Sequence, residues 1–454
     1  MWIYTVSLVV IASTSVCVNS LTQTNTKSTA FSYCMQAVYH HTCSNEWKNT
    51  KSISDFKQTM ITRGNHVWMI RFDGVPLGMV ETELVRWMKN AKLYRRSLSL
   101  SFSNTPFHDK NKTLATFSKL ETLVLKNNGL KNNIGFSLNP ELRDLSIVEN
   151  ELTSIPFKRI GKSLRRANFA NNRITSISNT FFKDRSITTY SLNLENNKIR
   201  ELPSKSLFNI NYIFLGGNQI KDFSSTVFNK VYRLELQGNL LTSLKVSMFN
   251  GLIPQYINVS NNQIHTIDKD FFLKITKDLL EIDLSYNKLS MLPVIDASLL
   301  PSLKVVRLDG NNLTSLDGVF LGKFSYLKTL SISDLGLKNI SEIPFYRMPE
   351  LRKLDLSNNS LLELDEFTFS NNFNLKDITM ETTKSFDGNG TEQSSPVFCS
   401  CEKNPRNMTL RCNPNENRSN YNSHFISSTI VIGEAICTVS FISDIDGPWS
   451  QEKK

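Results

Sequence analysis

The sequence predicts an α/β solenoid in which short parallel strands stack to form one concave sheet. A short phrase that first reads in full at residues 120–130 recurs as far as residue 364. It reads apolar, two spacers, apolar, spacer, apolar, two spacers, Asn, spacer, apolar. Self-similarity at a period of about 20–30 residues is typical of solenoids. The cysteines all lie outside this stretch, so the predicted array depends on its apolar and Asn positions alone.

The fourth residue of the phrase is an anchor that recurs at spacings of 21 to 25 residues. The anchors are Leu123, Leu145, Ala167, Leu192, Ile213, Leu234, Ile257, Ile282, Val306, Leu330, Leu354 and Ile378. The ninth residue is Asn128, Asn150, Asn172, Asn197, Asn218, Asn239, Asn262, Asn287, Asn311 or Asn359, while Leu335 and Thr383 depart from the rule. Adding two degenerate strands, anchored at Ile70 and Leu98, gives about 14 repeats over residues 67–380.

The physical reason for the phrase lies in the geometry of a strand. Successive side chains point to opposite faces, so positions four and six point inward and the spacers between them face the concave surface. The Asn stands where the chain turns off the strand. Its amide can donate and accept at once, and it can therefore satisfy backbone groups that the turn would otherwise bury without partners.

This phrase resembles the leucine-rich repeat, and the resemblance implies a horseshoe with a parallel concave β-sheet and disulfide-stapled caps. A second marker lies ten residues after the Asn, on the convex side. It comprises Phe182, Leu207, Phe228, Phe249, Phe272, Leu321, Phe345 and Phe369. This row resembles the phenylalanine spine of extracellular leucine-rich repeats, and we expect its rings to fill the core.

Residues 1–20 are predicted to be a signal peptide. An apolar stretch at residues 3–12 precedes Val18 and Ser20, which fit the −3 and −1 positions of a cleavage site, although basic residues are missing at the start. Secretion into an oxidising compartment also fits the six cysteines that remain after residue 20.

Residues 21–66 are predicted to form an N-terminal cap closed by a disulfide between Cys34 and Cys43. A zinc site is the alternative, because His40 and His41 lie between the two cysteines.

A polar loop is expected at residues 381–396, followed by a cysteine-rich C-terminal cap and tail at residues 397–454. The C-x-C sequence at Cys399 and Cys401 resembles the C-terminal flanking domain of extracellular leucine-rich-repeat proteins. That resemblance implies disulfides between Cys399 and Cys412 and between Cys401 and Cys437. The apolar stretch at residues 425–443 contains Glu434 and lacks a following basic cluster, so no membrane span is expected.

Eight N-x-S/T sequons are candidate glycosylation sites, which agrees with secretion. They are Asn111, Asn258, Asn312, Asn339, Asn358, Asn389, Asn407 and Asn417.

No catalytic, cofactor-binding or metal-binding motif is found, and we expect no enzyme activity. The six His residues are scattered and accompany no known catalytic signature. The formal net charge is +11, but the basic residues form no compact run along the sequence, so nucleic-acid binding is not predicted.

One group of outward positions differs from the small or charged residues found elsewhere. Tyr212 and Phe214 are expected on one strand, Arg233 and Glu235 on the next, and Tyr256 on the one after. Exposed aromatics next to Arg are enriched in binding hot spots, so these residues form the predicted ligand-binding patch. The alternative is that Phe214 packs against neighbouring strands and that nothing binds there.

Taken as a whole, the chain resembles Toll-type receptor ectodomains and insect leucine-rich immune proteins, without transmembrane, TIR or coiled-coil parts. The resemblance implies a secreted, non-enzymatic recognition protein in innate immunity, which binds an extracellular protein or a microbial-surface component and could form a dimer or hetero-complex. An extracellular-matrix or cell-adhesion scaffold is the alternative, and a membrane receptor is a third reading.

Overall fold

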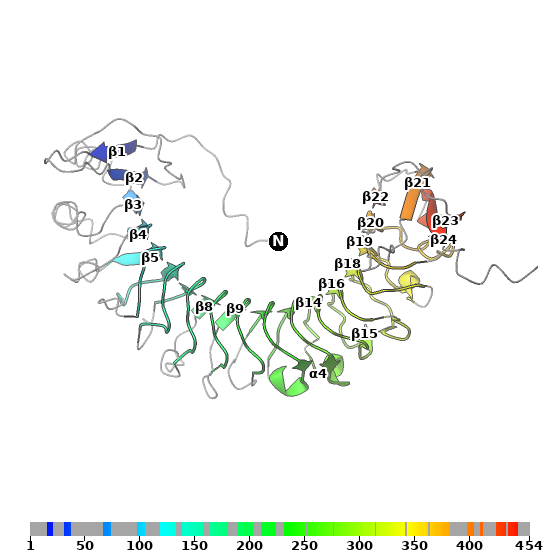
Figure 1. The fold of residues 1–454 in the computed structure, drawn as a ribbon, viewed down its shortest axis with the longest axis horizontal. Coiled ribbons are helices and arrows are strands. Elements are labelled where there is room, and N and C mark those ends of the chain that lie inside the picture. The colour runs from blue at the N-terminus through cyan, green and yellow to red at the C-terminus, as the bar shows by residue number, and fades with distance from the viewer. Residues whose placement is uncertain are drawn as a thin grey trace, which may run out of the picture. The chain divides into compact units, whose positions relative to one another are not determined.

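Short parallel strands recur through the computed structural model, as the repeat phrase predicts (Figure 1). The fold is a leucine-rich-repeat solenoid, which confirms the predicted fold class, while the disulfide-stapled caps stay a prediction. The structure describes residues 16–20, 31–37, 67–73, 98–104, 119–132, 139–157, 163–178, 189–202, 210–223, 231–249, 252–275, 277–313, 315–340, 343–361, 364–381, 397–403, 409–411, 424–432 and 435–443.

The chain divides into two compact units, which are described separately. The first comprises residues 1–218 and 226–229, and the second comprises residues 219–225 and 230–454.

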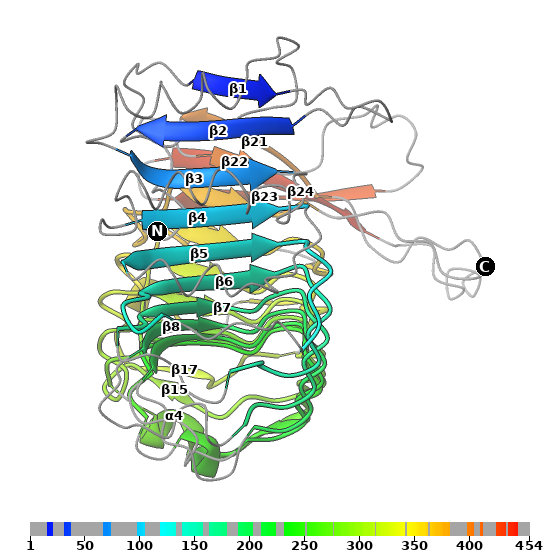
Figure 2. The ribbon, with the colours of Figure 1, turned by 90° about the vertical axis from the view of Figure 1, so that its left-hand side faces the viewer.

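The first unit is a sheet that is antiparallel at its start and parallel afterwards (Figure 2). Its strands are β1 Val16–Ser20, β2 Phe31–Ala37, β3 Val67–Asp73, β4 Leu98–Ser103, β5 Leu120–Lys126, β6 Asp144–Val148, β7 Arg166–Asn168, β8 Thr189–Asn193 and β9 Ile210–Phe214. β1 pairs with β2 and β2 with β3 in antiparallel register, whereas β3 to β9 run parallel. β1 lies inside the predicted signal peptide, so cleavage after Ser20 would remove this strand.

The pairing register confirms the predicted anchors, with one correction. Leu123 pairs with Leu145, and Leu145 with Ala167. In the degenerate strand β4, however, Ile70 and Leu123 both pair with Leu100. Leu98 was therefore the wrong anchor, because the repeat register places Leu100 at the fourth position.

The second unit continues the same architecture. Its parallel sheet contains β10 Arg233–Glu235, β12 Tyr256–Asn258, β14 Glu281–Asp283, β16 Val305–Arg307, β18 Thr329–Ser331, β19 Lys353–Asp355, β20 Asp377–Thr379 and β22 Thr409–Arg411. β22 lies beyond the predicted end of the array at residue 380, because Leu410 pairs with Ile378.

The return segments of the second unit carry short elements. Two parallel pairs form there, namely β11 Ser243–Leu244 with β13 Thr266–Ile267 and β15 Ile295–Asp296 with β17 Phe320–Leu321. The described helices are single turns: η5 Val246–Phe249, α4 Phe271–Lys274 and η6 Phe345–Arg347. After the repeats, β21 Val397–Lys403, β24 Ala435–Ser443 and β23 His424–Ile432 form an antiparallel sheet in that order.

Phenylalanines fill the core behind the sheet, as the predicted spine requires. Phe249, Phe272, Phe345 and Phe369 are buried. Leu321 was predicted to belong to this row but is 50% exposed, whereas Phe320 is 4% exposed. Phe320 pairs in register with the buried Ile295 of the preceding repeat, so Phe320 and not Leu321 takes the inward position. Phe182, Leu207 and Phe228 lie outside the described residues.

The buried Asn side chains link successive repeats. Asn262 Nδ2 donates to Leu236 O (3.0 Å) in the preceding repeat and to Val259 O (2.9 Å) and Ser260 O (3.1 Å) in its own. Its Oδ1 accepts a hydrogen bond from Leu241 N at 3.0 Å. One amide thus satisfies four backbone groups, which is the role predicted for this position.

The repeat that lacks the Asn is supported by the next one. Leu335 is buried and has no amide to offer, but its backbone N donates to Asn359 Oδ1 at 3.1 Å, as does the N of Leu337. The ladder therefore tolerates this one substitution.

The residue before the Asn adopts a left-handed backbone. Asn261 has φ 54°, Tyr286 has φ 54° and Gly310 has φ 61°. The Tyr286 ring lies over Gly310, where an added Cβ would be 2.4 Å from Tyr286 Cδ1. Gly310 is therefore needed for the close approach of the ring, whereas its φ alone is also adopted by Asn261 and Tyr286 at the equivalent position.

We predict that Asn262→Ala lowers the free energy of unfolding by about 2–4 kcal/mol, because it leaves several buried backbone groups without partners. Urea unfolding followed by circular dichroism measures the change. Gln263→Ala is the matched control, since Gln263 is an exposed amide in the same turn and should change stability by less than about 0.5 kcal/mol. Equal effects of the two substitutions would contradict the role assigned to Asn262.

Candidate binding surfaces

An aromatic pair lies on the concave sheet of the first unit. Tyr212 and Phe214 on β9 are both half-buried, as expected for outward spacers that pack sideways on the sheet. Tyr190 on β8 is 49% exposed, and its ring centroid is 4.8 Å from that of Tyr212. Sequence reasoning missed Tyr190 because it lies two residues before its anchor, outside the spacers between the inward positions.

A charged pair adjoins these rings. Arg166 Nε is 2.6 Å from Asp144 Oδ1, and Nη2 is 3.1 Å from Asp144 Oδ2. These hydrogen bonds, with smaller contributions from the charges of Asp144 and Tyr190, raise the pKa of Arg166 against the opposing effect of burial. The two-point contact fixes the guanidinium beside the aromatic pair.

The second unit contains the remaining three residues of the predicted patch. Arg233 on β10 pairs in register with Tyr256 on β12, and Arg233 Cζ lies 5.1 Å from the centre of the Tyr256 ring. Arg233 Nε also donates to Glu235 Oε1 at 2.5 Å. Glu235 is 5% exposed, which corrects the expectation that it faces solvent. Its charge is buried and compensated by Arg233, so Glu235 orients the Arg233 guanidinium.

The predicted patch thus falls into two described parts. Tyr212 and Phe214 belong to the first unit, whereas Arg233, Glu235 and Tyr256 belong to the second. Each part is ordered by its own contacts, and each offers an aromatic side chain beside an Arg.

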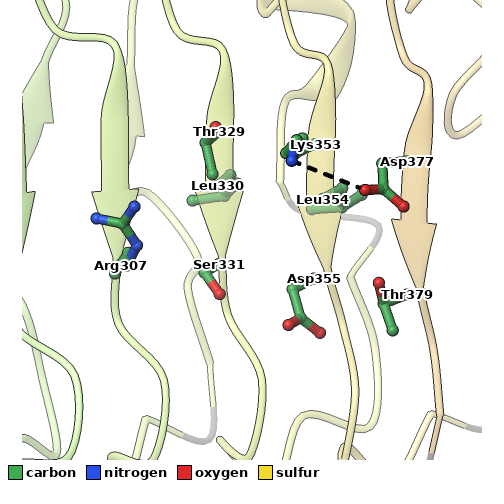
Figure 3. Close-up of a pocket in the computed structure, with 9 residues that line it drawn as sticks. All are labelled: Arg307, Thr329, Leu330, Ser331, Lys353, Leu354, Asp355, Asp377 and Thr379. Carbon is green, nitrogen blue, oxygen red and sulfur yellow. Dashed lines mark ion pairs between the residues drawn. The ribbon is translucent and has the colours of Figure 1, made fainter. Parts of the chain in front are cut away.

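A polar hollow of about 170 Å³ lies on the concave sheet of the second unit (Figure 3). Its lining residues are Arg307, Thr329, Leu330, Ser331, Lys353, Leu354, Asp355, Asp377 and Thr379. Lys353 Nζ is 4.0 Å from Asp377 Oδ2, a loose ion pair. Arg307 pairs instead with Glu281. Charged and hydroxyl side chains therefore surround a floor made by the anchors Leu330 and Leu354.

A buried carboxylate lies beside this hollow. Asp309 is 6% exposed and accepts hydrogen bonds from Ser285 Oγ (3.1 Å), Ser331 Oγ (2.7 Å) and both N (2.9 Å) and Oγ (2.7 Å) of Ser333. Sequence reasoning did not single out Asp309. The sequence does place Ser285 and Ser333 at the position equivalent to Asp309 in the preceding and following repeats. These serines supply the hydrogen-bond donors that a buried carboxylate needs.

Negative charge accumulates along the turns next to this sheet. Burial raises the pKa of Asp283, although Ser285 and Arg307 partly oppose the shift. Burial, and then the charges of Asp309, Asp334, Asp355 and Asp283, raise the pKa of Tyr286. This edge of the second unit is therefore acidic.

Other predicted sites are only partly described. Asn258, Asn312, Asn339 and Asn358 lie within the described residues, and the remaining sequons lie outside them. Cys34 is in β2 and Cys399, Cys401 and Cys437 are in the terminal sheet, where Cys401 pairs in register with Cys437. Cys43 and Cys412 lie outside the described residues, so the disulfide pairings stay predictions.

Neither a metal-binding cluster nor a membrane-spanning helix occurs in the part of the chain that the structure describes. No group of three or more His, Cys, Asp or Glu in this part of the chain could hold a metal ion. No helix among the same residues is long and apolar enough to cross a membrane.

The repeat geometry is that of the leucine-rich-repeat fold. Residues 255–313 and 301–361 match the family model described as "Leucine rich repeat".

The chain is similar to both matrix proteins and receptors of this class. Lumican of Rattus norvegicus is 28% identical over 233 residues, which cover 49% of this chain and 67% of lumican. Podocan of Mus musculus is 28% identical over 262 residues, which cover 55% of this chain and 42% of podocan. Toll-like receptor 3 of Homo sapiens is 28% identical over 187 residues, or 37% of this chain and 21% of the receptor. The chain thus spans less than half of podocan and of the receptor.

We predict that Asp283→Asn raises the free energy of unfolding at pH 7 by up to about 1 kcal/mol. The pKa of Asp283 is raised above its ordinary value of 3.8, so the native protein loses stability as pH rises above 3.8 through the folded pKa. Asparagine keeps the acceptor for Ser285 N and removes this cost. Urea unfolding at pH 7 and at pH 3 measures the difference, which should vanish at the lower pH.

Asp355→Asn is the matched control, because Asp355 Oδ1 accepts the same turn hydrogen bond, from Ser357 N at 3.0 Å. A stability gain for Asp283→Asn that persists at pH 3, or a loss at pH 7, would contradict the assignment.

Proposed function

We propose that the chain is a secreted, non-enzymatic recognition protein that binds a protein or microbial-surface component through its concave sheets. The observation that carries the proposal is the ordering of aromatic side chains on these sheets. The Tyr190 and Tyr212 rings pack against each other, and Arg233 lies over Tyr256. Side chains held in one geometry lose little conformational entropy on binding.

The chemistry of these clusters favours a protein ligand. Tyr and Arg are the residues enriched in interface hot spots, and both combine apolar contact area with hydrogen-bonding groups. The aromatic patch is defined as Tyr190, Tyr212 and Phe214 in the first unit, and Arg233 with Tyr256 forms a separate cluster in the second. Because Arg233 is already paired with Glu235, Tyr256 and its covering guanidinium would bind as one preformed surface.

The relatives support an extracellular location. Lumican and podocan are extracellular-matrix proteoglycans, and Toll-like receptors also carry this repeat. A signal peptide at residues 1–20, disulfides in the two flanks and glycans on the sequons complete the proposal. N-terminal sequencing of the protein collected from a culture medium tests the cleavage after Ser20.

An immune role and a matrix role both fit this scaffold. Similarity to Toll-like receptor 3 favours recognition in innate immunity, whereas similarity to lumican and podocan favours a matrix or cell-adhesion scaffold. Induction of the transcript on microbial challenge is expected for the first role, and constant expression in matrix-producing tissue is expected for the second.

We predict that Tyr212→Ala with Phe214→Ala weakens binding of the partner by about 30-fold, as expected for loss of a hot spot worth about 2 kcal/mol. The partner is first captured from extracellular fluid on the tagged full chain. Its affinity for each variant is then measured by surface plasmon resonance.

Tyr326→Ala with Tyr346→Ala is the control, because both tyrosines are exposed and lie in return segments away from the sheet strands. Unchanged affinity for the Tyr212 and Phe214 variant, or an equal loss for the control, would show that the concave aromatics do not bind the partner.

A further inference from the structure

A row of basic residues runs along the N-terminal ends of four parallel strands in the second unit. It is defined here as the cationic row and comprises Lys304, Lys328, Arg352 and Lys376. Each member is the second residue of its repeat phrase, two positions before the anchors Val306, Leu330, Leu354 and Ile378. The members are about 24 residues apart in the sequence, so no basic run is visible there.

Backbone hydrogen bonds join the members of the row directly. Lys328 N donates to Lys304 O at 2.8 Å, Arg352 N to Lys328 O at 2.9 Å, and Lys376 N to Arg352 O at 2.9 Å. Neighbouring strands of a sheet are about 4.8 Å apart, so the row presents four cations at a regular spacing over about 14 Å.

Little negative charge compensates this row. Arg352 Nη2 is 3.9 Å from Glu350 Oε2, and both side chains are partly exposed. Lys304, Lys328 and Lys376 have no ion pair within the part of the chain that the structure describes. Stacked like charges repel one another, and a bound polyanion would remove that repulsion.

The next position along the strands carries hydrogen-bonding groups. Thr329, Lys353 and Asp377 directly follow three members of the row, and Lys353, which is 67% exposed, forms the loose ion pair with Asp377 described above. Thr329 and Asp377 can accept hydrogen bonds from a ligand that carries hydroxyl groups. A phosphodiester backbone offers acceptors only, so these neighbours suit a hydroxylated polyanion better.

The C-terminal ends of the same strands are acidic. Asp309, Asp334 and Asp355 lie near the turns that follow the strands, and they raise the pKa of Tyr286 in the same region. A linear polyanion is therefore attracted to the cationic row and repelled from the C-terminal ends, which fixes its course across the strands.

We propose that the cationic row binds a linear sulfated polysaccharide, which lies across β16, β18, β19 and β20 with its sulfates on the basic side chains. Sulfated polysaccharides occur outside the cell, so this inference rests on the proposed extracellular location of the chain. The surface is distinct from the aromatic patch, so the chain could hold a protein partner and a polysaccharide at once.

The test uses the purified full chain and heparin as the probe, with affinity measured by isothermal titration calorimetry at several salt concentrations. The triple variant Lys304→Ala, Lys328→Ala and Lys376→Ala should bind heparin at least about tenfold more weakly. The slope of log affinity against log salt should fall by about 3, one for each cation removed.

The control is the triple variant Lys221→Ala, Lys288→Ala and Lys338→Ala, which removes the same charge from exposed lysines of the same unit. It should change the affinity by less than about twofold. An equal loss in both triple variants would overturn the proposal in favour of general attraction to a basic protein. Circular dichroism verifies that both variants keep the fold.

Single-stranded DNA of matched charge is the competing probe. Tighter binding of DNA than of heparin by the cationic row would overturn the assignment in favour of a nucleic acid. The Tyr212→Ala and Phe214→Ala variant should bind heparin like the unaltered chain. The experiments therefore distinguish failure of the proposed protein-binding function from failure of the proposed polysaccharide site.

Discussion

The buried Asn amide is the interaction on which the rest of this structure depends. A strand of three to five residues leaves most of its turn outside any ladder, and those backbone groups would be buried without partners. The Asn262 side chain forms hydrogen bonds with four such groups. One of them, Leu236 O, belongs to the preceding repeat, so this bond also fixes the register of neighbouring strands. Because one inward Asn makes these hydrogen bonds, the fold does not restrict the outward spacer residues of each strand, and they can vary.

That freedom explains why the fold was predictable and the surfaces were not. Anchors and Asn residues recur in register, so a single sequence predicts the strands and their parallel order. Phe320 escaped prediction because the return segments vary in length, so a fixed distance from the Asn does not identify the inward residue in every repeat. The burial of Glu235 was not predicted, because the alternation of side chains along a strand predicts the face on which a residue lies but not whether Arg233 covers it.

The cationic row shows a different limit of reading along the chain. Its members are far apart in sequence and become neighbours only through the repeat. Aligning the repeats at their second position would have shown them, whereas a search for consecutive basic residues could not. Asp309 is comparable, since its burial is understandable only when Ser285 and Ser333 are placed beside it. In a solenoid the informative unit is therefore the column of equivalent positions.

The Tyr286 and Gly310 pair has a consequence for how this array can change over time. The ring occupies the space that any side chain at position 310 would need. A substitution at position 310 is therefore acceptable only after position 286 has lost its ring, so the two repeats constrain each other's history. Related chains that keep an aromatic residue at position 286 should therefore also keep glycine at position 310.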